Sequence, residues 1–174
     1  DYIVRFYNPP GGRILLFLPC SYVKPYSKSR THRIIVKAIK EVCDRRRIHE
    51  VMISNAGVIP REFEDYYPFN NYNWDESQET GEVKKRYIEV TAERLVNYLG
   101  MHGGRYLNHC CYLSYDSESY RALERASKLT GVVVVNLLKK ETYDKLQGRG
   151  VLTSSEALSD LQTGLKCMLR KSTS

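Results

Sequence analysis

The chain has 174 residues, of which 42% are hydrophobic and 27% are charged, with a net charge of +7. This length is enough for one domain that needs no disulfide or metal for its stability, and no run approaches the roughly twenty apolar residues of a membrane span. The five cysteines fit neither an even disulfide framework nor a Cys-x-x-Cys metal spacing. We predict one cytoplasmic domain, residues 1–174, with an N-terminal extension over 1–12.

The basic charge favours a polyanionic partner, although a solvated basic surface without a ligand is the alternative. Along the chain, the apolar run at 13–19 (RILLFLP) is typical of a buried parallel strand. Ser29 is then predicted to cap a helix that runs to about Arg47. A second strand is expected at 50–55. The segment 56–81 is predicted to be a long irregular loop of the functional kind.

The second half of the chain alternates in the same way. Apolar residues at helical spacing predict helices over 82–99, 116–129 and 154–171. Strands are predicted at 105–115 and at the valine run 132–136. This order predicts an α/β protein, a three-layer α/β/α sandwich with a mainly parallel sheet of about four strands.

Ligands of parallel α/β sheets bind outside the carboxyl ends of the strands. Three predicted segments follow strand ends, at 20–32, 55–74 and 114–118, and they carry polar, aromatic and cysteine side chains. We therefore expect these segments to converge on one edge of the sheet, where they would form the functional site.

The first of these segments contains a spaced pattern, P-C-x3-K-P-Y-x2-S-x2-H, over residues 19–32. This pattern resembles the signature of the archaeosine synthase family, archaeal tRNA-modifying enzymes related to tRNA-guanine transglycosylase. The stretch 54–74, with its GVIPRE core, is similar to a second segment of that family. The resemblance extends over roughly residues 13–140, although the 78–81 segment keeps only its Thr-Gly end.

The resemblance implies a fold of the uracil-DNA glycosylase type and a transferase activity, also described as an amidinotransferase. Such an enzyme adds an amine nitrogen, in the family from lysine, to the nitrile of 7-cyano-7-deazaguanine in the tRNA D-loop, on the path to archaeosine. A radical-SAM enzyme acts later in that path. The resemblance therefore implies tRNA as a partner. Full-length members also carry transglycosylase-like regions and an RNA-binding PUA domain, which do not fit in this chain. Separate chains with those domains are further expected partners.

Within the motif, Cys20 is the candidate nucleophile, because nearby Lys24, Arg30 and His32 favour a thiolate that attacks the nitrile. The alternative is a buried cysteine that only packs. His32 is a candidate proton shuttle or else a packed histidine. The predicted substrate-binding residues of the motif are Lys24 for an anion, Tyr26 for the base, and Ser29, which is most simply a helix cap.

In the second segment, Glu62 is a catalytic candidate that reads the base edge or accepts a proton, and Arg61 is a candidate for phosphate binding. Asp116, together with Glu118, is a candidate for binding the donor's ammonium, or alternatively for capping a helix. Neighbouring residues of a strand point to opposite faces, so 109–111 (HCC) does not favour a metal site. The residues indicate no cofactor.

Two other functions remain open at this point. One is a non-catalytic, basic tRNA-binding subunit of a modification complex, which would tolerate changes at Cys20 and Glu62. The other is hydrolysis of base-glycosidic bonds, which the expected fold alone suggests, and a fold is weak grounds for an activity.

Overall fold

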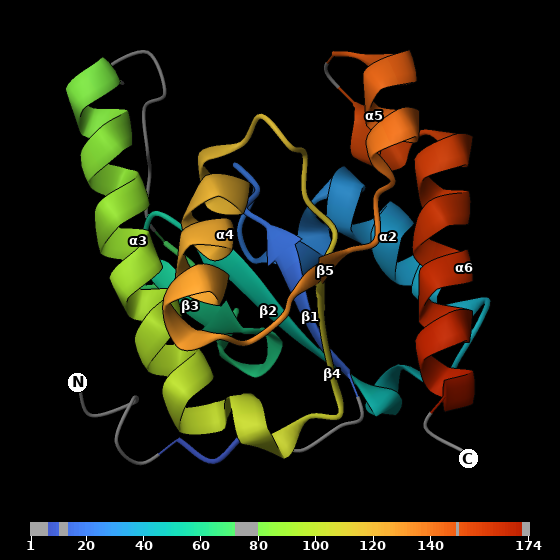
Figure 1. The fold of residues 1–174 in the computed structure, drawn as a ribbon, viewed down its shortest axis with the longest axis horizontal. Coiled ribbons are helices and arrows are strands. Elements are labelled where there is room, and N and C mark those ends of the chain that lie inside the picture. Colours follow the sequence, from blue (N-terminus) through green and yellow to red (C-terminus); the bar gives the residue numbers. More distant parts are fainter. Residues whose placement is uncertain (1–6, 11–13, 72–79, 149, 172–174) are drawn as a thin grey trace.

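A five-stranded sheet organises the part of the chain that the computed structural model describes, residues 7–10, 14–71, 80–148 and 150–171. The strand order is β3-β2-β1-β4-β5 (Figure 1). The strands are β1 (Ile14–Pro19), β2 (Ile48–Ser54), β3 (Gly57–Pro60), β4 (Asn108–Cys111) and β5 (Val135–Asn136). All neighbouring pairs are parallel except β2 and β3, which are antiparallel.

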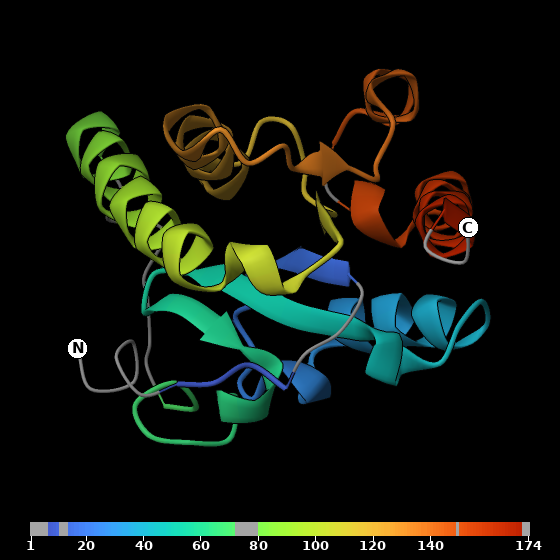
Figure 2. The same cartoon turned by 60° about the horizontal axis from the view of Figure 1, so that its bottom comes forward.

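Helices cover both faces of the sheet and complete three layers (Figure 2). The helices α2 (Arg30–Lys40) and α6 (Ser155–Lys171) lie on one face, with α5 (Lys140–Leu146) nearby. The other face carries α3 (Gly81–His102) and α4 (Glu118–Thr130). The predicted α/β/α sandwich is therefore confirmed, with five strands in place of about four.

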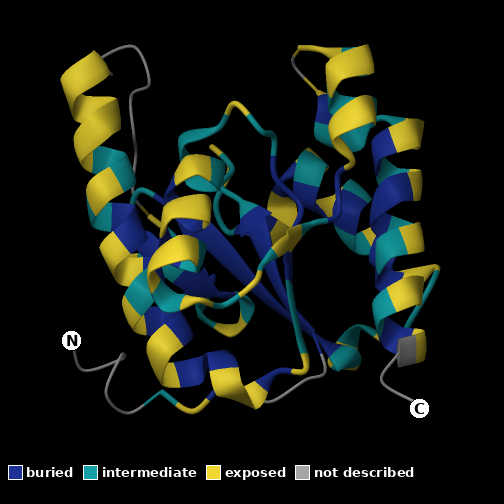
Figure 3. Ribbon diagram, viewed as in Figure 1, coloured by how far each residue is buried: buried dark blue, intermediate teal, exposed yellow. Residues whose placement is uncertain are grey.

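The central strands form the core because their side chains are apolar on both faces. All residues of β2 and all but the last of β1 are buried. Leu16 of β1 belongs to the cluster with α2 and α6, whereas Leu15 and Phe17 belong to the cluster with α3 and α4. Figure 3 shows the buried strands between helices that are buried only on their inner sides. Burial of each such side chain contributes about 2 kcal/mol.

The helices predicted at 82–99, 116–129 and 154–171 are present as α3, α4 and α6. The first predicted helix is shorter than expected, because α2 ends at Lys40 and three arginines form a separate 3-10 turn, η2 (Arg45–Arg47). The Asp44 side chain starts that turn by accepting a hydrogen bond from the Arg46 backbone N–H at 3.0 Å. Other 3-10 turns are η1 (Tyr26–Lys28), η3 (Arg61–Phe63), η5 (Gly103–Arg105) and η6 (Val151–Thr153).

Two predicted strands and the long loop need correction. The valine run 132–136 was expected to be a strand throughout, but only Val135 and Asn136 pair, at the edge of the sheet, and Val133 is 75% exposed. The strand expected at 105–115 is confined to β4. The segment 56–81 is not wholly irregular, since it begins with β3 and η3.

Some predictions fall outside the described residues. They are those for 72–79 of the loop, including Tyr72 and Trp74, and for most of the extension 1–12. Among the helices that the structure describes, none combines the length and the apolar character needed to cross a bilayer.

Candidate active site

A pocket of about 230 Å³ lies at the carboxyl ends of the parallel strands. Its lining comes from three strand ends and one neighbouring helix: Pro19, Cys20, Ser21, Tyr22 and Lys24 after β1, Asn55 after β2, Ser117, Glu118 and Ser119 at the start of α4, and Tyr87 of α3. This is the edge at which α/β sheets bind their ligands. The volume is slightly below the roughly 300 Å³ of the smaller drug-sized sites, so the pocket suits one base or a small side chain.

Cys20, the candidate nucleophile, lines this pocket. It follows the last residue of β1 and is half-buried. The Lys24 ammonium nitrogen lies 3.7 Å from the Cys20 sulfur and also donates to the Ser21 carbonyl. The Tyr26 hydroxyl is 3.9 Å from the same sulfur. A cation and a hydroxyl thus lie beside the sulfur, where they can stabilise negative charge that develops during a reaction at this atom.

The Tyr26 ring makes a cation–π contact with the Lys24 ammonium. The Lys24 nitrogen lies 5.0 Å from the ring centroid, within the range of a cation–π contact. Tyr26 itself is fully buried. It does not line the pocket, so the predicted contact with a base is not possible in this structure, and its hydroxyl instead contacts the Cys20 sulfur.

The first turn of α4 contributes hydrogen-bond donors to the pocket. The Ser117 hydroxyl caps the helix by accepting from the Tyr120 N–H at 3.2 Å, and it donates to the Ser114 carbonyl at 2.7 Å. Helix geometry provides no intrahelical acceptor for the N–H groups of Glu118 and Ser119, which line the pocket. A helix N-terminus favours negative charge, so this wall can stabilise a developing anion.

Tyr87 and Glu118 are the other ionisable groups of the pocket wall. The Tyr87 hydroxyl lies 3.2 Å from the Ser119 hydroxyl, and burial raises the Tyr87 pKa, which keeps the phenol protonated as a donor. Glu118 lies 3.7 Å from the Lys84 ammonium at the rim, where both side chains are partly exposed. The pocket therefore contains both a proton donor and a carboxylate.

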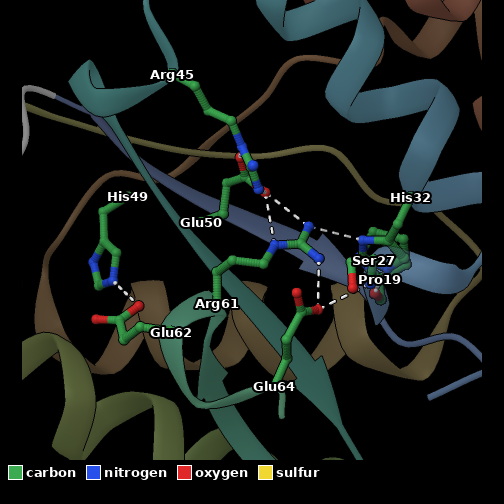
Figure 4. Close-up of polar contacts among 9 residues, drawn as sticks. All are labelled: Pro19, Ser27, His32, Arg45, His49, Glu50, Arg61, Glu62 and Glu64. Carbon is green, nitrogen blue, oxygen red and sulfur yellow. Dashed lines mark hydrogen bonds and ion pairs between the residues drawn. The ribbon is translucent and has the colours of Figure 1, made fainter. Parts of the chain in front are cut away.

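A second polar cluster contacts the Pro19–His32 segment through Ser27 and His32 (Figure 4). Its centre is Glu50 of β2, whose side chain is only 2% exposed. Arg61 donates to one Glu50 oxygen from Nε at 2.9 Å and from Nη2 at 2.7 Å. Arg45 donates to both oxygens of the same carboxylate, and its Nη2 bond is 3.0 Å long. Burial by itself would raise the Glu50 pKa, but Arg45 and Arg61 outweigh burial and keep that pKa below its usual value.

Arg61 uses its remaining donors inside the same cluster. Its Nη1 donates to Glu64 at 3.0 Å, and its Nη2 donates to Nδ1 of His32 at 3.0 Å. Glu64 also accepts from the backbone N–H of Ser27 at 3.0 Å. Because four of its five N–H groups are donated to protein groups, Arg61 is not placed for a two-pronged contact with a phosphate, which corrects the prediction from the sequence.

His32 is fully buried, and both of its nitrogens are used. Its Nε2–H donates to the Pro19 carbonyl at 2.9 Å, while Nδ1 accepts from Arg61. Burial, followed by the charge of Arg61, lowers the His32 pKa to about 4. This placement contradicts the predicted proton shuttle, because His32 is a neutral residue that fixes the end of β1 and does not line the Cys20 pocket.

Glu62 is separated from Cys20. It accepts from Nε2 of His49 at 3.2 Å and from the Tyr7 hydroxyl. His49 lies near the amino end of β2, whereas Cys20 follows the carboxyl end of β1. Among residues 55–71, the part of the segment that the structure describes, Asn55 lines the pocket and Glu62 does not, because β3 runs antiparallel to β2 and carries Glu62 back towards the opposite edge.

Two further predicted residues lie outside the pocket. Ser29 is the N-cap residue of α2, as the capping alternative predicts, but it makes no side-chain cap hydrogen bond and is 3% exposed, so a substrate cannot reach it. Asp116 is exposed and does not line the pocket. Glu118, two residues further on, occupies the wall instead.

Four pocket residues were not singled out from the sequence: Asn55 and Ser117, which lie in the segments 55–74 and 114–118 expected at this edge, and Tyr87 and Ser119, which lie outside them. Asn55 and the two serines follow strand ends or begin a helix, which is a weak signal, and Tyr87 reaches the pocket from α3 with no local signal. In the HCC stretch the neighbouring cysteines point to opposite faces of the sheet, since Cys110 packs in the core on the α2 side and Cys111 in the core on the α4 side.

The fold and the pocket define an α/β domain with a candidate nucleophilic cysteine at the ligand-binding edge of its sheet. The chain belongs to the family described as a domain of unknown function, DUF5591, whose model matches residues 1–163. A crystal structure of AF0587, a protein of unknown function, has a similar fold, with a TM-score of 0.59 and 22% identity, and the match covers 89% of this chain and 45% of that chain.

Curated relatives connect the chain with archaeosine synthases. It is 31% identical over 142 residues to archaeosine synthase subunit alpha of Methanosarcina acetivorans, covering 76% of this chain and 21% of that protein. It is 40% identical over 74 residues to the Thermoplasma acidophilum subunit alpha, covering 42% and 14%. For the archaeosine synthase of Haloferax volcanii the identity is 39% over 94 residues, covering 49% and 14%. The chain thus spans 14% to 21% of the length of these relatives, and the family resemblance seen in its motif is confirmed.

Proposed function

We propose that this chain acts in archaeosine biosynthesis as the centre that adds an amine to the nitrile of 7-cyano-7-deazaguanine in tRNA. The observation that carries the proposal is the Cys20 sulfur, 3.7 Å from the Lys24 ammonium, in a base-sized pocket at the carboxyl edge of the sheet. The relatives' names support the pathway, and the geometry supports a nucleophilic reaction at this position.

The proposed reaction has two steps. The Cys20 sulfur bonds to the nitrile carbon, one π bond of the nitrile breaks, and the proton that the thiol loses is transferred to the nitrile nitrogen, which gives a thioimide. The neutral amine of the donor then bonds to the same carbon, the carbon–sulfur bond breaks, and the proton that the amine loses returns to the sulfur. The product is an amidine and a free thiol, so atoms and electrons balance without an oxidant or reductant.

The pocket residues suit the charges that develop in these steps. Negative charge grows on the nitrile nitrogen as the sulfur attacks, and the N–H groups of Glu118 and Ser119 and the Tyr87 hydroxyl provide donors on the pocket wall. Lys24 stabilises negative charge on the sulfur before attack and after its release. The Glu118 carboxylate at the rim is the proposed site for an ammonium group of the donor, with lysine as the proposed donor.

The other activities of the pathway are assigned to other polypeptide segments. Because the chain spans 14% to 21% of its curated relatives, base insertion and PUA-type tRNA binding belong, in this proposal, to further domains or subunits. The name subunit alpha of two of these relatives fits a multi-chain complex. A radical-SAM enzyme would then cleave the lysine adduct.

The test is the intact mass of tRNA fragments that carry 7-cyano-7-deazaguanine after incubation with the protein and free lysine. We expect a gain of one lysine mass, lowered at least about a thousandfold in rate by Cys20→Ala. Cys167→Ala is the matched control, because Cys167 is an exposed cysteine on α6 and should not affect the rate. An adduct that forms equally well with Cys20→Ala would refute the nucleophile. Binding of the tRNA without any adduct, even with partner chains added, would favour a non-catalytic tRNA-binding subunit.

A further inference from the structure

A groove of about 600 Å³ runs along α2, on the other side of the Pro19–His32 segment from the Cys20 pocket. Basic side chains outnumber acidic ones in its lining. The basic lining residues are Arg33, Lys37, Lys40, Arg45 and Arg61, and the acidic ones are Glu41 and Glu64. None of these residues belongs to the proposed reaction centre.

The floor of the groove is electrically balanced. Arg45 and Arg61 are paired with Glu50 and Glu64 in the buried cluster of Figure 4. His32, which closes one side, is neutral because its pKa is lowered to about 4. The floor therefore provides a rigid surface but little net charge.

The rim of the groove carries the unbalanced charge. Arg33, Lys37 and Lys40 are exposed, and among the described residues none of the three forms an ion pair. Glu41, the acidic residue nearest to them in the sequence, accepts a hydrogen bond from the Gln162 side chain at 2.9 Å. Positions 33, 37 and 40 follow helical spacing, so the three cations form one stripe that extends about 10 Å along α2.

We propose that this stripe binds the phosphodiester backbone of the substrate tRNA next to the nucleotide whose base enters the Cys20 pocket. Exposed cations without protein partners on one helix face are the electrostatic requirement for phosphate contacts. The two sites share a wall, since Pro19 lines the pocket, His32 lines the groove, and the two residues are joined by a hydrogen bond of 2.9 Å. The identity of the RNA as tRNA rests on the proposed function, whereas the backbone contact rests on the charge of the groove.

The experiment measures binding of an unmodified tRNA transcript by fluorescence anisotropy at several salt concentrations. The variant is Arg33→Gln, Lys37→Gln and Lys40→Gln combined. The matched control combines Arg121→Gln, Arg125→Gln and Lys128→Gln, exposed residues of α4 with the same spacing on the opposite face of the sheet. Both variants remove three positive charges, so their difference separates position from net charge. Thermal melts verify that both are folded.

We expect the α2 variant to bind at least tenfold more weakly and the slope of log K against log salt to become about 2 to 3 units shallower. The α4 control should stay within about twofold of the wild type. Equal weakening in both variants, or no salt-dependent binding by the wild-type chain, would overturn the proposal. Because the transcript lacks the nitrile base, this result does not depend on whether the chain adds an amine to a nitrile, and either proposal can fail without the other.

Discussion

The Cys20 pocket and the Glu50 cluster lie on the two sides of the same segment, residues 19–32, and they differ in how their polar groups are used. In the Glu50 cluster, Arg61 and His32 form hydrogen bonds with other buried protein groups. In the pocket, Cys20 and the first two residues of α4, Glu118 and Ser119, line an open cavity. Within the motif of residues 19–32, some residues therefore stabilise the segment, as His32 does, and others line the pocket, as Cys20 does.

The largest effect that would test this division is expected from Arg61→Met. The substitution leaves Glu50 with Arg45 alone and leaves Glu64 without its arginine, so we expect the free energy of unfolding to fall by about 3 to 5 kcal/mol, measured by urea denaturation. Arg46→Met is the control, because the Arg46 side chain is 90% exposed beside Asp44 and its loss should leave the stability unchanged. Equal stability of the two variants would mean that the cluster is not structural.

A second effect concerns pH and His32. The folded chain keeps His32 neutral down to about pH 4, whereas the unfolded chain protonates it below about 6.5. Between these values the unfolded state binds more protons, so this contribution to stability is complete above pH 6.5 and is lost as the pH falls towards 4. The loss amounts to about 3 kcal/mol.

His32→Gln isolates that contribution, because glutamine keeps a donor and an acceptor but does not titrate. We expect the fall in stability between pH 6.5 and 4 to be smaller in the variant by about the same amount, measured by urea denaturation at each pH. The low pKa of Glu50 acts in both proteins and cancels in the difference. Parallel pH profiles for the two proteins would show that His32 becomes protonated without cost in the folded chain.

The smallest expected effect is that of a substitution at the rim of the Cys20 pocket. If Glu118 binds the ammonium of the donor, Glu118→Gln should raise the KM for lysine about tenfold, which corresponds to about 1.4 kcal/mol, while tRNA binding and stability change little. The measurement is the rate of adduct formation against lysine concentration. Asp116→Asn is the matched control, since that carboxylate does not line the pocket. A larger effect from Asp116 would restore the assignment made from the sequence.

The sequence by itself determined the layer architecture, three of the long helices and the position of Cys20 at a strand end. These features follow from local patterns, because apolar runs specify buried strands, helical spacing specifies amphipathic helices, and parallel strands direct their carboxyl ends to one edge. The 19–32 motif was also sufficient to indicate the family, as the comparisons confirm.

Only the tertiary structure decided which motif residues meet the pocket. Glu50 has no distinctive signal in the sequence, yet it pairs with Arg61, eleven residues later. Arg61 also contacts His32, which burial and the charge of Arg61 keep neutral. The antiparallel turn into β3 removes Glu62 from the pocket, and Tyr87 enters it from α3. Such assignments depend on which distant groups compete for the same hydrogen bonds in a buried environment, and spacing along the chain does not encode that competition.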